Sequence, residues 1–524
     1  MCLRLFYYTS FLTIYSSANF TLQKLPDIKG YIYFLILTLG MMAPMPIYSQ
    51  TKVIKFTPDA TAAYQMVMQL RLNEAQQKIN QIKKEDPNNA VVYFLENYID
   101  FFTIFIGENS ADFKKLKENK DKRLEMISKT DPKSPYYLYC KAEINLQWAL
   151  VRLKFEEYTK AFFEVKSAYS DLQDNSRKFP GFVANKKSLG VLHAAIGTIP
   201  DEYKWGVSWI GGMKGTIDQG IGELEAVINY GNKNEFLFKD ESVVMYAFVM
   251  LHLNNKPEKA WQVISTSKID PKTSPLACFA ISNIAIRTGR NELAIKYLTS
   301  RPKGAKYFPF FYLDFMLGVA KLHRLDADAA DYLEIYIKNF KGRNYIKEAY
   351  QKLAWSYLAN GNLTGYTLNM ANVLKYGKDQ LDEDKTAQKE AKSGISPHPL
   401  LLQSRLLFDG GYLVRAYKLL NATNESYFKS VNDRLEYNYR KGRVAHSLKN
   451  YIEALQYYTQ TIEKGKNSSS YFACNAALNV GLIYEAQNKT SLAKQYYNLC
   501  LSLQPSEYKS SLHQKAKAGL NRME

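Results

Sequence analysis

The side chains that could bind a metal or transfer a proton are scattered along this chain. Its six histidines are His193, His252, His323, His398, His446 and His513. No two of them have the HExxH spacing that places two zinc ligands on one helix face. No GxSxG elbow or nucleophile, base and acid set accompanies them. We therefore predict no catalytic site, no metal and no cofactor. His193 lies in an unusual segment, but a lone histidine is more often a core residue than a catalytic one.

The glycines between Gly211 and Gly222 superficially suggest a phosphate loop. However, the stretch from Gly211 to Thr216 is not GxxxxGK[ST], and Gly220-Ile221-Gly222 stops short of GxGxxG. Close packing of helices explains these glycines better, because a residue without a Cβ atom lets two backbones approach. The sequence predicts this role for Gly211, Gly212 and Gly215, so Gly212→Val should disrupt packing.

Thiol chemistry is also weakly supported. The cysteines are Cys2, Cys140, Cys278, Cys474 and Cys500. They are widely spaced and form no CxxC pair, which excludes a disulfide scaffold and a zinc ribbon. The last four lie among apolar residues, so we expect them to pack as small buried hydrophobic side chains rather than to take part in redox chemistry. Only Cys474 and Cys500 are close enough in sequence to suggest a disulfide.

A regular spacing of small and large residues organises the body of the chain. In the clearest unit Gly481 is followed by Ala493, Tyr497 and Pro505, and the unit before it has Gly442, Ala454 and Tyr458. A third unit, with Ala63, Ala75 and Pro87, lies near residue 50. Two antiparallel helices approach closely where small residues meet, and residues four apart share a helix face. This spacing resembles the tetratricopeptide repeat, a helix pair in which a small residue faces an alanine.

The middle of the chain carries weaker copies of the same spacing. They are Phe248, Ala260 and Ile264; Ser282, Ala294 and Leu298; Gly318 and Ala330; and Ala354, Tyr366 and Met370. No alternating strand pattern bounded by hairpin turns occurs. We therefore predict an all-α fold: a right-handed superhelical α-solenoid of antiparallel helix pairs with an irregular Gly-rich insert.

The expected organisation has six parts. They are a signal peptide with an upstream extension at 1–49, helix pairs at 50–178, a Gly-rich apolar insert at 179–231, degenerate pairs at 232–376, a charged excursion or irregular helix at 377–399, and repeats at 400–524. The insert combines Trp205 and Trp209 with many glycines, a composition that would aggregate if exposed, so we expect it to be buried.

The insert also resembles a second family. Its segments Gly190-Val191-Leu192-His193, Ile199-Pro200, Trp209-Ile210-Gly211-Gly212 and Gly220-Ile221-Gly222-Glu223-Leu224 are similar to the large tetratricopeptide proteins related to the eukaryotic inclusion-body-clearance protein. The sequence departs from that family because no aromatic residue follows the first glycine of the turn. The resemblance implies one continuous solenoid with this segment packed inside, and it transfers no ligand site.

The amino terminus has the order of a secretory signal. Lys29-Gly30 precedes an apolar run from Tyr31 to Met42, and Pro44, Pro46 and Ser49 follow. The run is shorter than the roughly 20 residues of a membrane span. We expect cleavage near Ser49 and a soluble mature protein in a bacterial periplasm or cell envelope.

The composition fits a folded binding protein. Apolar residues make up 46% of the chain, and the formal net charge is +19, with Lys and Glu interspersed along helices. Nucleic-acid motifs are missing, so we expect no nucleic-acid partner. Peripheral association with envelope membranes is compatible with this charge.

We predict a non-catalytic scaffold that binds a protein or peptide in the concave groove lined by first helices. Repeat geometry places the candidate contacts Tyr437, Asn438, Lys441 and Asn475 toward that groove. The alternative is a binder of a small hydrophobic or lipid ligand, in a pocket lined by Trp205 and Trp209.

Overall fold

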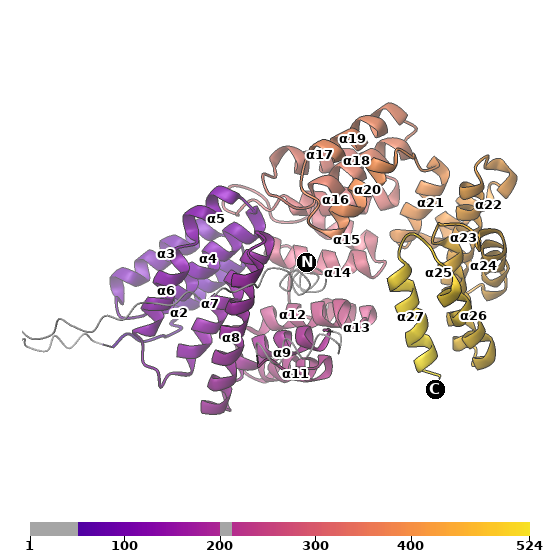
Figure 1. Cartoon of the computed structure of the whole chain (residues 1–524). Coiled ribbons are helices and arrows are strands. Elements are labelled where there is room, and N and C mark those ends of the chain that lie inside the picture. Colours follow the sequence, from indigo (N-terminus) through magenta and orange to yellow (C-terminus); the bar gives the residue numbers. More distant parts are fainter. Residues whose placement is uncertain (1–50, 200–211, 524) are drawn as a thin grey trace, which may run out of the picture. The chain divides into compact units, whose positions relative to one another are not determined.

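The structure is a computed structural model that describes residues 51–199 and 212–523 (Figure 1). Every named element in these two ranges is a helix. Extended pairing there is limited to two isolated bridges, Lys52 with Thr130 and Val53 with Asn89. The prediction of an all-α fold is therefore confirmed. The predicted signal peptide, Trp205, Trp209 and Gly211 lie outside the described residues.

The chain divides into two compact units. Unit 1 is Met1–Ile284 with Arg301–Pro309, and unit 2 is Ala285–Ser300 with Phe310–Glu524. The helices up to the boundary are α2 Pro58–Met68, α3 Leu72–Glu85, α4 Val91–Gly107, α5 Ser110–Leu116, α6 Asn119–Ser128, α7 Pro135–Lys154, α8 Tyr158–Lys178, α9 Ala184–Gly197, α11 Ile217–Lys233, α12 Lys239–His252, α13 Pro257–Thr266 and α14 Pro275–Arg287.

Unit 2 continues the series of helix pairs. Its helices are α15 Asn291–Thr299, α16 Tyr312–Arg324, α17 Ala329–Asn339, α18 Ile346–Ala359, α19 Leu363–Lys375, α20 Asp382–Ser393, α21 Pro399–Asp409, α22 Leu413–Asn421, the short 3₁₀ helix η2 Glu425–Tyr427, α23 Val431–Ser447, α24 Tyr451–Gly465, α25 Phe472–Ala486, α26 Thr490–Ser502 and α27 Lys509–Asn521.

One turn geometry recurs between the two helices of a pair. A residue with positive φ stands two positions before the second helix in most of these turns: Leu70, Glu156, Asn255, Gly289, Gly361, Gly411, Lys449 and Asn488. In the last two turns the next amide donates back to the first helix, Asn450 to the Ala445 carbonyl at 2.9 Å and Lys489 to the Tyr484 carbonyl at 2.9 Å. This is the Schellman closure of a helix end. The shared turn relates the degenerate pairs to the clear ones.

The predicted repeat positions form the contact between paired helices. Ala454 and Ala493 are fully buried. The adjoining glycines, however, face the tyrosine one turn beyond the alanine: a Cβ atom on Gly442 would lie 2.7 Å from the Tyr458 ring, and one on Gly481 would lie as close to the Tyr497 ring. Glycine is thus required here because an aromatic ring occupies the space of its side chain.

The first unit shows the same burial. Ala63 of α2 and Ala75 of α3 are fully buried, and Pro87 follows the end of α3 at Asp86. In the pair α16 and α17 the predicted register is wrong by one residue. Ala329 is fully buried whereas Ala330 is partly exposed, and Gly318 faces Leu333. The cause is the turn, which places the buried alanine four residues after left-handed Leu325, against five in the last two pairs.

The described part of the Gly-rich segment is a helix pair. Helices α9 and α11 pack directly against each other through Gly190 and Gly220. Gly215 also comes close, since a Cβ atom on it would meet the His193 backbone. The prediction for Gly212 is wrong: nothing lies within 4 Å of a Cβ there, and its φ of 65° is what favours glycine.

Residues 382–393 of the charged segment form a regular helix. This helix, α20, packs on α18 and α19, with Asp384 and Ala387 buried. The Asp384 carboxylate accepts hydrogen bonds from the backbone amides of Tyr345 at 2.7 Å and Glu348 at 3.0 Å. It therefore caps the amino-terminal end of α18, which the sequence around that end does not do by itself.

Candidate functional site

The first helices of successive pairs in unit 2 contact one another. Helix α18 packs on α21, α21 on α23, and α23 on α25. Because neighbouring first helices line one side of such an array, side chains on this side form one surface. We call it the first-helix face and define it by the following side chains, which contact one another within or between these helices: Lys352, Trp355, Arg405, Phe408, Tyr439, Arg440, Arg443, Asn475 and Asn479.

Two cations lie over the indole of Trp355. The Lys352 ammonium is 4.0 Å from the ring centroid, and the Arg405 guanidinium, from the next first helix, is 4.7 Å away. Contacts of this kind are worth more when they are desolvated. Burial lowers the pKa of Lys352, although Glu348, 3.5 Å from its ammonium, opposes the change. The α18 and α21 end of the face is therefore a cation and aromatic array.

The same chemistry continues onto α23. Arg443 lies 4.3 Å from the centroid of the Phe408 ring on α21. Arg440 donates to Glu436 one turn away at 2.7 Å, with only 12% of its side chain exposed. Burial works against the charged form of Arg443, but the neighbouring tyrosine Tyr439 outweighs it and raises the arginine's pKa. Both arginines thus stay charged at the surface of the array.

Amide side chains complete the face on α25. Asn475 donates to the Tyr439 hydroxyl at 2.7 Å, and Asn479 donates to the Asn475 backbone carbonyl at 2.7 Å. Both asparagines are half-buried. Their remaining donors and acceptors can pair with the backbone of an extended chain, which is how peptide ligands gain affinity without sequence-specific contacts.

Three of the four predicted contact residues lie beside this face. Tyr437, Asn438 and Lys441 are buried. The Tyr437 hydroxyl donates to the carbonyls of Leu420 at 3.2 Å and Thr423 at 2.9 Å, in the preceding pair. The Lys441 ammonium lies 4.4 Å from the Tyr457 ring of α24. Their contact with a partner stays a prediction, whereas Asn475 belongs to the face directly.

Arg405, Phe408, Arg443 and Asn479 were not predicted. The signal that could have found them is helical spacing, since residues three or four apart share one side of a helix. Positions 436, 440 and 443 of α23 and positions 475, 479 and 482 of α25 follow that spacing. Tyr437 and Lys441 are displaced by one residue, which turns them toward the second helices.

A buried charged cluster in unit 1 involves the Gly-rich pair. Lys187 of α9 is completely buried, and its ammonium contacts Glu143 of α7 at 2.8 Å and Glu241 of α12 at 3.0 Å. Burial alone would lower the pKa of Lys187, but the two carboxylates outweigh it and the pKa is raised. Burial, helped by Glu241, raises the pKa of Tyr64, whose hydroxyl donates to that carboxylate at 3.1 Å.

This cluster joins α9 to α7 and α12. Ser188, the neighbour of Lys187, also donates to Glu143. On the opposite side of α9, His193 Nδ1 lies 2.6 Å from Glu223 of α11. Lys187 and His193 of α9 thus contact carboxylates of α7, α11 and α12. The pocket predicted around Trp205 and Trp209 lies outside the described residues, and that alternative stays a prediction.

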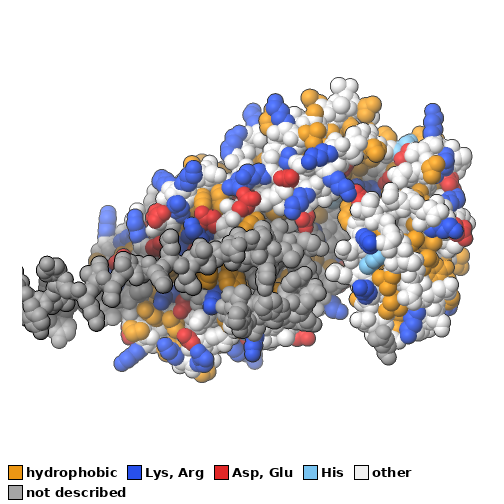
Figure 2. Space-filling view, in the orientation of Figure 1, with side chains coloured by type: hydrophobic (Ala, Val, Ile, Leu, Met, Phe, Trp, Pro, Cys, Tyr) orange, Lys and Arg blue, Asp and Glu red, His pale blue; other side chains and the backbone are white. Residues whose placement is uncertain are grey.

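Within residues 51–199 and 212–523, three or more His, Cys, Asp or Glu side chains nowhere gather as metal ligands would. No helix in those ranges combines the length and apolarity needed to span a bilayer. Figure 2 shows Lys and Arg side chains spread over the visible surface rather than gathered in one block, as expected from the interspersed charges.

Comparison with known proteins identifies part of the chain. The family model of the tetratricopeptide repeat matches residues 435–463 and 475–507. These ranges contain α26 and most of α23, α24 and α25, the pairs in which the glycine and tyrosine contacts are clearest. No curated protein matches the chain.

Solved structures give weaker likenesses. The structure of Naa15/Naa10 bound to HypK-THB is 12% identical, with 89% of this chain and 79% of that chain covered and a TM-score of 0.20. A circular tandem repeat protein with novel repeat topology and enhanced subunit contact surfaces is 10% identical, with 88% and 95% covered and a TM-score of 0.12. Neither likeness indicates a function for this chain. The resemblance to the inclusion-body-clearance relatives stays a prediction.

Three features coincide in residues 435–507: the match to the tetratricopeptide model, the antiparallel helix pairs and the left-handed turn between paired helices. Repeats of this kind generally serve as non-catalytic surfaces for protein interaction, which supports a scaffold. The chain carries tetratricopeptide repeats at residues 435–463 and 475–507.

Proposed function

We propose that this protein is an exported, non-catalytic scaffold that binds a polypeptide partner across the first-helix face of unit 2. The observation that carries the proposal is the unbroken series of contacts from Trp355 through Phe408 and Tyr439 to Asn475, on four successive first helices. Such a series offers an extended ligand one contact site per repeat.

The chemistry of the face suits a mixed polar and aromatic segment. Arg405 and Arg443 hold flat guanidinium groups against rings, and a guanidinium can pair with a carboxylate while it stays stacked. The charges are partly balanced within the face, because Asp409 lies 3.7 Å from Arg405 and Glu436 pairs with Arg440. A ligand with both acidic and hydrogen-bonding groups therefore fits better than a uniformly acidic one.

The test places a photo-crosslinking residue on each side of one repeat. Asn479 on the first-helix face is replaced in one variant, and exposed Gln495 of α26 is replaced in the matched control. We expect a covalent adduct with a polypeptide from cell-envelope extracts at position 479 and none at position 495. Adducts of equal yield at both positions, or at position 495 alone, would contradict the proposed face.

Export is a separate part of the proposal. It is supported by the basic, apolar and Pro-containing order of Lys29 to Ser49. The intact mass of the protein isolated from its native cells should correspond to a chain that begins near Gln50. Recovery of a cytoplasmic form that retains Tyr31 to Ser49 would defeat export without affecting the binding face.

A further inference from the structure

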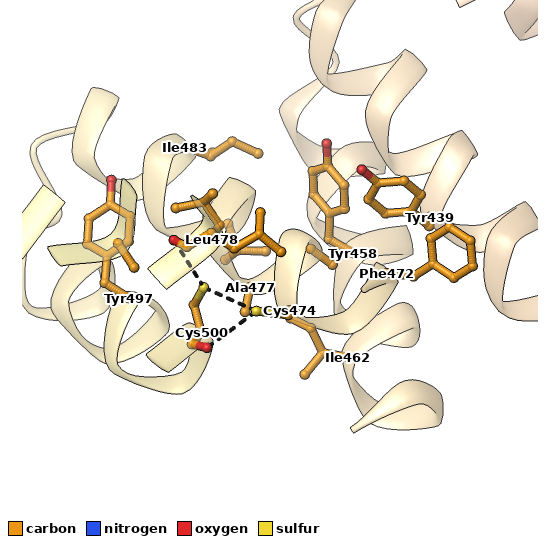
Figure 3. Packing of buried hydrophobic residues seen from close by; sticks show 14 of the residues in the cluster. Tyr439, Tyr458, Ile462, Phe472, Cys474, Ala477, Leu478, Ile483, Tyr497 and Cys500 are labelled. Carbon is orange, nitrogen blue, oxygen red and sulfur yellow. Dashed lines mark hydrogen bonds between the residues drawn. The ribbon is translucent and has the colours of Figure 1, made fainter. Parts of the chain in front are cut away.

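The last matched repeat contains two thiols in direct contact. Sγ of Cys474 on α25 lies 3.5 Å from Sγ of Cys500 on α26, and 3.4 Å from the Cys500 carbonyl oxygen (Figure 3). Both side chains are buried in the cluster that contains Tyr458, Leu478 and Tyr497. In the structure both cysteines are free thiols.

We propose that Cys474 and Cys500 are a disulfide-forming pair that covalently ties α25 to α26. A disulfide requires an S–S distance of about 2.05 Å, so the sulfurs need to approach by roughly 1.5 Å. The two sulfurs contact each other and the backbone carbonyls of Cys500 and Leu512, at 3.4–3.9 Å. The proposal is independent of any partner on the first-helix face.

The environment of this pair differs from that of the other described cysteines. Hydrogen bonding from Cys500 lowers the pKa of the Cys474 thiol, and the same interaction, together with burial, raises the pKa of Cys500. By contrast, burial raises the pKa of Cys140 well above its usual value and that of Cys278 to about 11. The thiolate is the nucleophile in exchange, and because the two sulfurs lie in direct contact, either cysteine can begin it; attack by Cys474 is one of these two routes.

Access to the pair is controlled by α27. This helix packs on α25 and α26, and its Leu512 carbonyl lies 3.9 Å from Cys500 Sγ. Leu512 and Ala516 of α27 belong to the same buried cluster as the two cysteines. An external disulfide therefore reaches the thiols before α27 has packed, or when that helix opens.

The chemistry balances with oxidised glutathione as the oxidant. The Cys474 thiolate attacks one sulfur of glutathione disulfide, forming a mixed disulfide and releasing one glutathione thiolate, which takes a proton from water. The Cys500 thiol then loses its proton and attacks the Cys474 sulfur, releasing the second glutathione. Two protein thiols are oxidised by two electrons in total, and one glutathione disulfide is reduced to two thiols.

The cross-link has a consequence for stability. It closes a loop from residue 474 to residue 500 and restricts the unfolded chain, which is the main source of disulfide stabilisation in the entropy model. We expect the oxidised repeat to unfold at a higher denaturant concentration than the reduced repeat. Such a bond would persist in an oxidising compartment and be lost in a reducing one.

The experiment uses the full chain incubated with mixtures of oxidised and reduced glutathione, followed by acid quenching, alkylation under denaturing conditions and peptide mapping. The expected result is a peptide pair joined through Cys474 and Cys500 that has lost two hydrogens, with Cys140 and Cys278 alkylated. In Cys500→Ser, Cys474 should stop at the glutathione adduct. The matched control Cys140→Ser should form the same cross-link as the native chain.

Two results would overturn the proposal. In the first, the chain is unfolded in denaturant and refolded by dilution in the presence of oxidised glutathione, and both Cys474 and Cys500 are still alkylated afterwards. The other is a stable glutathione adduct on Cys474 in the native chain, which would show that Cys500 does not resolve it. Because the readout is the bond itself, a failed partner search would leave it unaffected.

Discussion

Gly190 of α9 and Gly220 of α11 lie so close together that a Cβ atom on Gly190 would be 2.8 Å from the Gly220 carbonyl oxygen. A Cβ on Gly220 would in turn lie 2.7 Å from the Ala194 amide nitrogen. Real Cβ atoms do not approach backbone atoms this closely, so the two helices cross at a distance that only glycine permits.

We predict that Gly220→Ala destabilises the protein by about 1–3 kcal/mol, the usual cost of forcing extra volume into a packed contact. Gly222→Ala is the matched control, since it is in the same helix and nothing lies within 4 Å of its Cβ. That control should be neutral or stabilising by up to roughly 1 kcal/mol, from helix propensity. Denaturant unfolding measures both, and equal midpoints for the two variants would show that the crossing is wider than described.

Removing the buried ammonium of Lys187 should be more costly. Lys187→Met leaves Glu143 and Glu241 without their common partner, and loss of one member of a buried ion pair costs roughly 3–5 kcal/mol. The matched control is Lys186→Met, one residue away and exposed, for which we expect a change within about 0.5 kcal/mol. Unfolding free energies of the two variants decide the question; a Lys187→Met protein as stable as its control would mean that the cluster is solvated.

The repeat crossings in unit 2 can be tested by adding volume. Ala454→Leu and Ala493→Leu should each cost about 1–3 kcal/mol, because both alanines are fully buried between paired helices. Ala518→Leu on exposed α27 surface is the control and should have little effect. Unchanged denaturant midpoints for both buried variants would place the helix contacts elsewhere.

His323 should make stability depend on pH. Burial lowers its pKa from 6.5 to about 4, while Asp409 opposes this and Lys352 and Arg405 add to it. The unfolded chain therefore binds a proton that the folded chain does not, and stability falls as pH decreases from 6.5 toward 4. The loss reaches up to about 3 kcal/mol.

The measurement compares the native chain with His323→Gln at about pH 7.5 and about pH 5. At the higher pH the histidine is neutral in both states, so this pair of values gives the structural cost of the substitution alone. At the lower pH the difference should shift in favour of the variant. If the difference does not change with pH, the pKa of His323 is the same in the folded and the unfolded chain, and its burial does not lower it.

The helix pairs could be predicted from sequence because their signal is local. Gly442, Ala454 and Tyr458 stand at fixed spacings within one pair, and the same spacing returns with Gly481, Ala493 and Tyr497. Positions that are buried between helices require small or hydrophobic residues, so their spacing is visible in the sequence. The presence of an all-α fold follows from the same local pattern.

The roles of individual residues depended on information that is not local. Gly212 and Gly220 look alike in sequence, yet one serves a left-handed turn and the other a helix crossing, and only the path of the partner helix separates them. Likewise Arg440 and Lys441 are neighbours on α23, and a rotation of one residue places Lys441 against Tyr457 of α24 and Arg440 on the face. A rotation of this size is below what spacing alone can resolve.

The cap on α18 has a consequence for the order in which the chain can fold. The carboxylate that satisfies the amides of Tyr345 and Glu348 comes from Asp384, so the start of this helix depends on a residue made some 36 to 39 positions later. During synthesis or translocation α18 and α19 emerge first, and the first turn of α18 stays frayed until α20 follows. Residues 346–393 thus form a cooperative three-helix step, and a pause in chain delivery before Asp384 would leave that step exposed to proteases.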